Sequence, residues 1–124
     1  MPLHSIVHME FYSTDFEKLK KFYGELFGWT FKPWGDYYML FMPPPENGYL
    51  GGGVLFAKEP KPIQNLKYYV EVDDIDKYLE KAKAIGWEIV AGKGPIPNVG
   101  FYGQIKDFDG NLVNLYENMP ESKQ

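Results

Sequence analysis

The chain has 124 residues, of which 44% are hydrophobic and 18% aromatic, so a single domain of this length can bury a substantial core. Its 17 acidic residues outnumber its 13 basic ones, all of them lysine, and the formal net charge is −4. We therefore expect no nucleic-acid partner, because the basic stripe and arginine forks that grip phosphates are missing. Without cysteine, disulfides, thiolate metal ligands and thiol nucleophiles are excluded.

The sequence carries no pattern of a leader or a membrane segment. Residues 1–11 lack a basic region followed by an apolar stretch, and no run approaches the roughly 18 apolar residues of a membrane span. We expect a cytoplasmic protein with no membrane partner.

Residues 5–12 alternate between two kinds of side chain, which predicts a strand. One face carries Val7 and its apolar neighbours and is expected to pack on a helix. The other face carries His8, Glu10 and Tyr12, which are therefore candidates for the lining of a cavity.

A helix is predicted directly after this strand. Thr14 and Glu17 have the spacing of a capping box, in which each side chain satisfies a backbone donor of the other residue. Gly28 supplies a left-handed stop. The residues between them place apolar side chains at helical spacing: Phe16, Leu19, Phe22, Tyr23, Leu26 and Phe27.

The same pattern returns about 59 residues later. Residues 66–72 are predicted to form a strand, and Asp73 or Asp74 to cap a second helix that ends at Gly86. Each predicted helix is followed by glycine and tryptophan. Three further strands are predicted after each helix: near residues 30–32, 37–42 and 49–57 in the first half, and near 88–91, 101–106 and 111–117 in the second.

The sequence therefore predicts one α+β domain over residues 1–124, made of two βαβββ modules. The modules span about residues 4–57 and 66–118, with a proline-stiffened linker at 58–65 and a tail at 119–124. Each half alone is too small to bury both faces of its sheet. The halves must share a core or a cavity.

Two segments carry a family resemblance: residues 8–29 (HMEFYSTDFEKLKKFYGELFGW) and 107–117 (DFDGNLVNLYE). They resemble the opening and closing segments of the glyoxalase/bleomycin-resistance/dioxygenase superfamily, also called vicinal oxygen chelate. The resemblance covers roughly residues 4–118. It implies two βαβββ modules that form a curled mixed sheet around a cavity, a small-molecule ligand in that cavity and a homodimer.

Metal-using members of such families place one ligand on the first strand and one on the last strand of each module. The resemblance puts His8 and Glu117 at two of these places, as candidate catalytic residues and ligands for Zn, Ni, Mn or Fe. The repeat images of these two residues are Lys67 and Leu55, and neither suits a cation, because leucine has no donor and an ammonium repels the ion. Glu10 is a candidate replacement, but the ligand set stays incomplete.

Several further residues are candidates for the pocket wall. Glu117 alternates with Val113 and Leu115, so we expect it to face the cavity, where an ion pair with Lys67 is an alternative to a metal. An ordinary role as partly buried strand residues stays open for every candidate. The candidate ligand-binding residues are Glu10, Tyr12, Lys67, Tyr69, Glu71, Phe101 and Tyr102.

Two glycine-containing segments have separate explanations. Residues 51–53 are consecutive glycines inside a predicted strand with no helix after it, so they favour a bend or a close approach rather than a phosphate loop. Residues 94–100 (GPIPNVG) predict a loop, since proline and glycine prevent regular strand pairing, and this loop lies either on the ordinary surface or at the rim of the pocket.

Two functions from different classes follow. The first is a small-molecule-binding protein with no obligatory metal, which sequesters a compound or catalyses a proton transfer through His8 or Glu117. The alternative is a divalent-metal-dependent lyase, isomerase or dioxygenase that holds its ion with His8, Glu117 and Glu10. An accessory domain that acts through its partners is a third hypothesis, so a binding protein and an enzyme both stay open.

Overall fold

The computed structural model describes residues 3–4, 6–44 and 50–120. It divides into two compact units, unit 1 (Met1–Lys61) and unit 2 (Pro62–Gln124). The division falls inside the predicted linker, residues 58–65. In the part of the chain that the structure describes, no helix is long and apolar enough to cross a bilayer.

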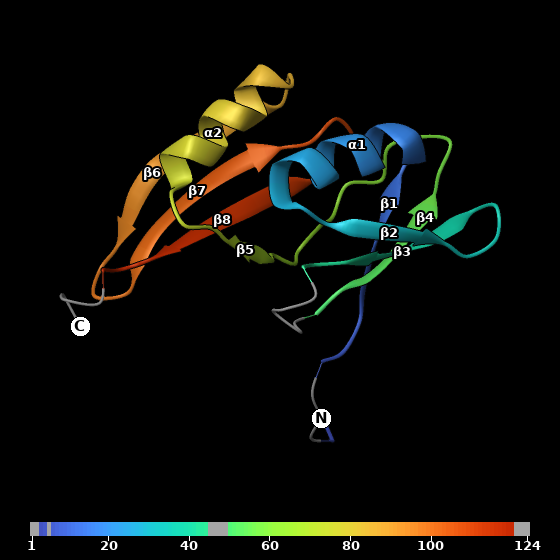
Figure 1. Cartoon of the computed structure of the whole chain (residues 1–124), viewed down its shortest axis with the longest axis horizontal. Helices are drawn as coiled ribbons and strands as arrows, with labels where there is room; N and C mark the ends of the chain where they lie inside the picture. The colour runs from blue at the N-terminus through green and yellow to red at the C-terminus, as the bar shows by residue number, and fades with distance from the viewer. Residues whose placement is uncertain (1–2, 5, 45–49, 121–124) are drawn as a thin grey trace. The chain divides into compact units, whose positions relative to one another are not determined.

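Unit 1 contains one helix and a four-stranded sheet (Figure 1). Its elements are β1 (Met9–Ser13), α1 (Phe16–Phe27), β2 (Thr30–Pro33), β3 (Tyr38–Met42) and β4 (Gly52–Phe56). The strand order is β1-β4-β3-β2, with β1 parallel to β4 and the other pairs antiparallel. The sheet therefore places β4 between β1 and β3.

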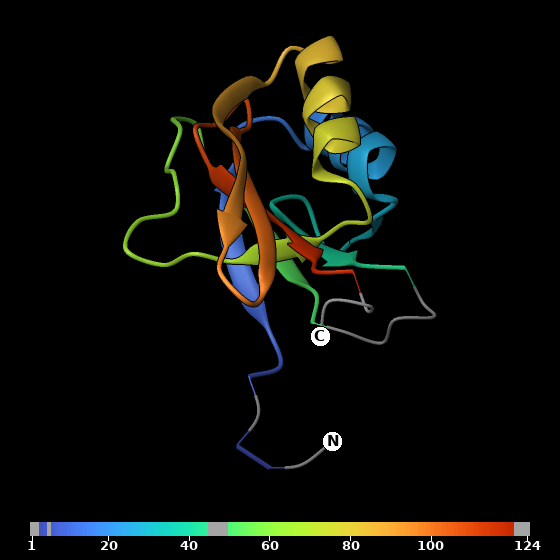
Figure 2. The ribbon, with the colours of Figure 1, turned by 90° about the vertical axis from the view of Figure 1, so that its left-hand side faces the viewer.

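Unit 2 repeats this order of elements, and α2 lies along one face of its sheet (Figure 2). Its elements are β5 (Tyr69–Glu71), α2 (Ile75–Ala84), β6 (Glu88–Ile96), β7 (Gly100–Lys106) and β8 (Leu112–Asn118). The strand order is β5-β8-β7-β6, with β5 parallel to β8. Both units are βαβββ modules, so the predicted α+β class is confirmed.

The two modules have separate four-stranded sheets. The single-domain organisation and the cavity with its ligand stay predictions. The beginning of the strand predicted at residues 49–57 and the end of the tail predicted at 119–124 lie outside the described residues.

Aromatic packing defines the covered face of the sheet in unit 1. Phe11 of β1 contacts Tyr23 of α1, with ring centroids 6.0 Å apart, and Trp29 stacks on Tyr23 at 5.0 Å and on Phe41 of β3 at 4.8 Å. Strand residues alternate between the two faces of a sheet. The side chain of Glu10 therefore lies on the opposite face, which we call the open face of unit 1.

Packing against α2 defines the covered face in unit 2. A Cβ added at Gly103 of β7 would meet side-chain atoms of Ile75 and Leu79 of α2. Gly103 is in register with Leu115 of β8, which is fully buried, as is Val113. Residues of β7 and β8 with the opposite parity form the open face of unit 2.

The prediction of the helix starts was partly wrong. Asp15, not Thr14, is the N-cap of α1, and its carboxylate accepts a hydrogen bond of 3.0 Å from the backbone N–H of Lys18. Gly28 ends this helix with φ 72°, as predicted. Asp74 occupies the N-cap position of α2 but makes no side-chain capping bond.

The prediction of a loop at residues 94–100 was right only for the turn at residues 97–99. Residues 94–96 belong to β6, and Pro95 is in register with Phe101 of β7. Proline is tolerated here because β6 is an edge strand. On the edge where β6 has no neighbouring strand, the missing N–H of proline removes no hydrogen bond of the sheet. Register shifts between Ile89 and Gly94 take up the irregularity.

Substitution of the two N-cap residues distinguishes the contribution of a capping hydrogen bond from that of an aspartate which only occupies the N-cap position. Asp15→Ala should lower the free energy of unfolding by about 1 kcal/mol, because the N–H of Lys18 loses its partner. Asp74→Ala, the matched control, should cost less, since no capping bond is lost. Urea unfolding followed by circular dichroism measures both, and equal losses would contradict the assignment.

Candidate functional site

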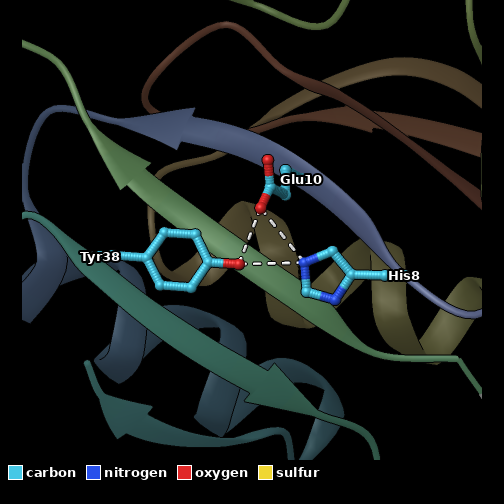
Figure 3. A network of polar contacts seen from close by, with 3 residues as sticks. All are labelled: His8, Glu10 and Tyr38. Atoms are coloured by element: carbon cyan, nitrogen blue, oxygen red, sulfur yellow. Dashed lines mark hydrogen bonds and ion pairs between the residues drawn. The ribbon is translucent and has the colours of Figure 1, made fainter.

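Three polar side chains meet on the open face of unit 1 (Figure 3). The Tyr38 hydroxyl donates a hydrogen bond of 2.8 Å to Oε2 of Glu10. Nε2 of His8 lies 2.9 Å from the Tyr38 oxygen and 3.2 Å from the same Oε2. We call these residues the His8–Glu10–Tyr38 cluster.

The strand order brings the three together. Glu10 lies on the edge strand β1, and His8 precedes that strand by one residue on the same side of the alternation. Tyr38 begins β3, two strands away, and reaches across β4. Met39 and Phe41 of β3 are buried, so alternation directs Tyr38 to the open face.

The hydrogen bonds determine which nitrogen of His8 carries a proton. The single hydroxyl proton of Tyr38 goes to Glu10, so Nε2 of His8 can bond only by donating to the two oxygens that face it. In the neutral imidazole the lone pair then lies on Nδ1. Nδ1 is directed away from both oxygens (Figure 3) and has no hydrogen-bond partner among the described residues.

The cluster shifts the acidity of two members in opposite directions. Hydrogen bonds from Tyr38 and then from His8 hold the pKa of Glu10 below its usual range, so this carboxylate stays ionised at neutral pH. Burial, followed by the hydrogen bond to Glu10 and its charge, raises the pKa of Tyr38 to about 12, so the phenol stays protonated. The site therefore places an ionised carboxylate and a protonated phenol beside the imidazole of His8.

Glu117 does not face the open side of unit 2, so the prediction that it faces a cavity was wrong. Its Oε1 accepts a hydrogen bond of 2.9 Å from the backbone N–H of Ile75, the first residue of α2. Its partner in an ion pair is Lys93 at 3.2 Å, and not Lys67 as predicted. Glu117 thus shares the covered face with Val113 and Leu115 and caps the helix.

The other candidates of unit 2 lie apart from one another along the sequence and on both faces of the sheet. Tyr69 and Glu71 lie on β5, and Glu71 accepts a hydrogen bond of 2.7 Å from Asn118. Lys67 is exposed and precedes β5. Phe101 is in register with Glu117 and lies under Lys93, 4.5 Å from the ring centroid, so it belongs to the covered face. Tyr102, the next residue, is on the open face.

The remaining candidate of unit 1, Tyr12, is on the open face with Glu10. The amino group of Lys61 lies 5.0 Å above the centroid of its ring. Such a cation–π contact holds the ring in place and puts a positive charge near the site.

Register also corrects the repeat alignment of the last strands. Glu10 pairs with Gly53 in unit 1, and Tyr69, its repeat image, pairs with Asn114 in unit 2. Asn114 is therefore the image of Gly53, and Leu55, two residues beyond Gly53, matches Tyr116 rather than Glu117. Asn114 is buried and is bonded to Gln104 and to the backbone oxygen of Tyr68.

Sequence reasoning missed Tyr38, Gly53 and Asn114. The alternation of Tyr38 with Met39 and Phe41 could have placed the phenol on the open face. No pattern in the sequence gives the strand order, and without that order Tyr38 and Glu10 are unrelated.

A family model supports the fold by an independent route. The model described as the Glyoxalase/Bleomycin resistance protein/Dioxygenase superfamily matches residues 5–115. The chain belongs to this superfamily. The predicted membership is confirmed, and no curated protein matches the chain in sequence.

Solved structures with the same fold include several superfamily members. A fosfomycin resistance protein, FosX, from Listeria monocytogenes has a TM-score of 0.75 at 18% identity, covering 99% of this chain and 100% of its own. FosX from Mesorhizobium loti has a TM-score of 0.69 at 16% identity, with 98% of each chain covered. A glyoxalase-related enzyme from Fulvimarina pelagi has a TM-score of 0.72 at 18% identity, covering 94% and 89%. At these identities the likeness shows the superfamily fold alone.

The donors of the described residues do not fit a divalent metal centre, although the Listeria FosX has been solved with Mn(II) and sulfate. A catalytic centre needs about three protein ligands, and among the described residues no three His, Asp or Glu side chains are grouped to hold an ion. His8 and Glu10 are engaged with each other through Nε2, and Nδ1 points away from the carboxylate.

Removal of the Glu117 side chain tests its structural role. Glu117→Ala should lower the free energy of unfolding by about 1–2 kcal/mol, because the N–H of Ile75 loses a charged acceptor. Glu88→Ala, the control, breaks an exposed ion pair of 4.0 Å with Lys106 and should change stability by less than about 0.5 kcal/mol. Thermal and urea unfolding measure both. Equal effects would show that Glu117 does not cap α2.

Proposed function

We propose that this superfamily member binds a small organic compound against the open face of unit 1 and exchanges a proton with it through His8. Nδ1 of His8 is the proton-transfer atom. Glu10 orients the imidazole and stabilises its protonated form, and Tyr38 holds the carboxylate of Glu10. No obligatory metal takes part.

The observation that carries the proposal is the pairing of Nε2 of His8 with the ionised carboxylate of Glu10 at 3.2 Å. A carboxylate on one ring nitrogen fixes the tautomer and leaves the other nitrogen as a base. The pair is accessible to a ligand, since the side chains of His8 and Glu10 are 43% and 45% exposed. A structural ion pair gains little at such exposure.

The ligand is proposed to lie against the open face of unit 1. In unit 1, Tyr12 and Leu55 offer aromatic and apolar contact beside the cluster. For unit 2, the roles of Tyr69, Glu71 and Tyr102 in ligand binding stay predictions. Glu117 and Phe101 are left out of the proposal, because Glu117 bonds the backbone of Ile75 and Phe101 lies under Lys93. Homodimerisation and a cytoplasmic location also stay predictions.

The proton transfer is testable with 5-nitrobenzisoxazole, a neutral aromatic compound. A base removes the proton on C3, the N–O bond breaks, and a coloured cyanophenolate forms with its new charge on oxygen. The wild type should accelerate this elimination beyond free imidazole, and His8→Gln should lower the rate by about 10²-fold or more. The absorbance of the phenolate measures the rate.

The second histidine supplies a matched control. His4 is exposed and lies outside the cluster, so His4→Gln should leave the rate unchanged. Glu10→Gln, which keeps the shape and removes the charge, should fall between the wild type and His8→Gln. Equal rates for His8→Gln and the wild type would overturn the role of His8.

The metal-dependent alternative has its own test. After incubation with Zn, Ni, Mn or Fe(II) and removal of excess, the wild type should retain well below one ion per chain, because the cluster supplies two engaged donors. Mass spectrometry of the metal content measures this. Retention of one ion per chain that is lost in His8→Ala would replace the metal-free proposal with a metal-dependent lyase, isomerase or dioxygenase.

A further inference from the structure

Gly53 occupies the place on β4 over which Tyr38 crosses. It pairs with Glu10 of β1 on one side and with Leu40 of β3 on the other. A Cβ at this position would overlap the hydroxyl oxygen and the Cζ atom of Tyr38. The phenol therefore lies directly above the glycine, in space that any other residue would fill.

The need for glycine here is one of space and not of backbone conformation. Gly53 does not have a φ in the left-handed region, unlike Gly28 at 72°. Gly52, its neighbour, has a different role, since a Cβ there would overlap backbone atoms of Met9 on β1. Gly52 allows the strands to approach each other, whereas Gly53 makes room for one side chain.

We propose that Gly53 is a positioning residue of the site: its missing side chain opens a bay over β4 that seats the Tyr38 phenol against Glu10. This inference rests on the proposed function for its catalytic meaning. The geometry it describes exists in the ligand-free protein and can be tested there. Gly53 touches no reacting atom and acts through Tyr38.

The bay explains how the cluster keeps one arrangement on an exposed face. The phenol lies flat across the middle strand, so its oxygen reaches the carboxylate of Glu10 on the far strand at 2.8 Å. A methyl group at position 53 would lift the ring off the sheet. Glu10 would lose a hydrogen-bond donor, and the lifted ring would enter the space offered to a ligand.

The first test is the titration of Tyr38 and Glu10 in Gly53→Ala, followed by carbon-13 NMR of the phenol and carboxyl carbons without ligand. In the wild type the pKa of Tyr38 is about 12. In Gly53→Ala it should fall by about one unit or more, because the ring becomes hydrated and leaves the anion. The pKa of Glu10 should rise towards its usual value. Gly92→Ala is the control, since a Cβ there meets nothing within 4 Å, and it should change neither.

A double-mutant cycle with Tyr38→Ala distinguishes seating of the ring from a general effect of the added methyl group. If Gly53 acts only through the ring, adding Gly53→Ala to Tyr38→Ala should change neither the pKa of Glu10 nor the unfolding midpoint. Should Gly53→Ala fail to fold, the double variant should fold like Tyr38→Ala. An unchanged titration of Tyr38 in folded Gly53→Ala, or a double variant that is worse than Tyr38→Ala, would overturn the inference.

These outcomes are separable from the proposed function. If the wild type showed no elimination that depends on His8, the proposed proton transfer would be overturned. The titrations of Tyr38 and Glu10 without ligand would still test the role of Gly53. If both hold, Gly53→Ala should lower the elimination rate severalfold, and by less than His8→Gln, since the base itself is still present. A Gly53→Ala protein with shifted titrations and a wild-type rate would remove the catalytic meaning of the bay.

Discussion

The packing of α1 on the sheet of unit 1 determines where every member of the candidate site lies. Phe11, Phe41 and Val54 are buried on the covered face of β1, β3 and β4. Each is adjacent in sequence to a residue of the open face. Because a strand has only two faces, burial of these apolar residues turns Glu10 and Gly53 outward. The chemistry of the open face thus follows from the apolar core beneath it.

The His8–Glu10–Tyr38 cluster adds little to the stability that positions it. Ion pairs between half-exposed side chains are screened by water and contribute little to stability. The cluster therefore depends on the backbone for its geometry, and its electrostatic strength depends on how much water surrounds it. A bound compound that displaced this water would strengthen the pairing of His8 and Glu10 when His8 takes up a proton. The pairing of His8 and Glu10 can therefore respond to ligand binding, because it is weak in the free protein.

Much of the fold could be predicted because local patterns in the sequence determine which segments form helices and strands. Period-two and helical spacing, with Gly28 and the tryptophan after each helix, predicted the order of elements in both βαβββ modules, although β6 extends to Ile96, beyond the strand predicted near residues 88–91. Which face of a strand meets a helix is not a local property. Val113 and Leu115 would suit either a cavity or a helix, so the orientation of Glu117 was predicted wrongly from a correct alternation.

The site itself needed information that no single segment carries. His8 and Glu10 were found because they are two residues apart on one strand. Tyr38 was missed because its contact depends on the insertion of β4 between β1 and β3, which chain order does not reveal. The glycines at residues 51–53 were assigned to a bend or a close approach, and the two different approaches at Gly52 and Gly53 become visible only with the strand register.

The two units use the same register position in different ways, and this explains their unequal chemistry. In unit 1 the position is Gly53, which leaves space for a phenol to reach a carboxylate on the edge strand. In unit 2 it is Asn114, whose buried amide bonds Gln104 and the backbone of Tyr68. An amide is neither an acid nor a base near neutral pH, and it has no charge to orient an imidazole. The glycine on β4 thus leaves room for titratable side chains to meet in unit 1. The asparagine at the equivalent position on β8 fills that place in unit 2 with neutral hydrogen bonds.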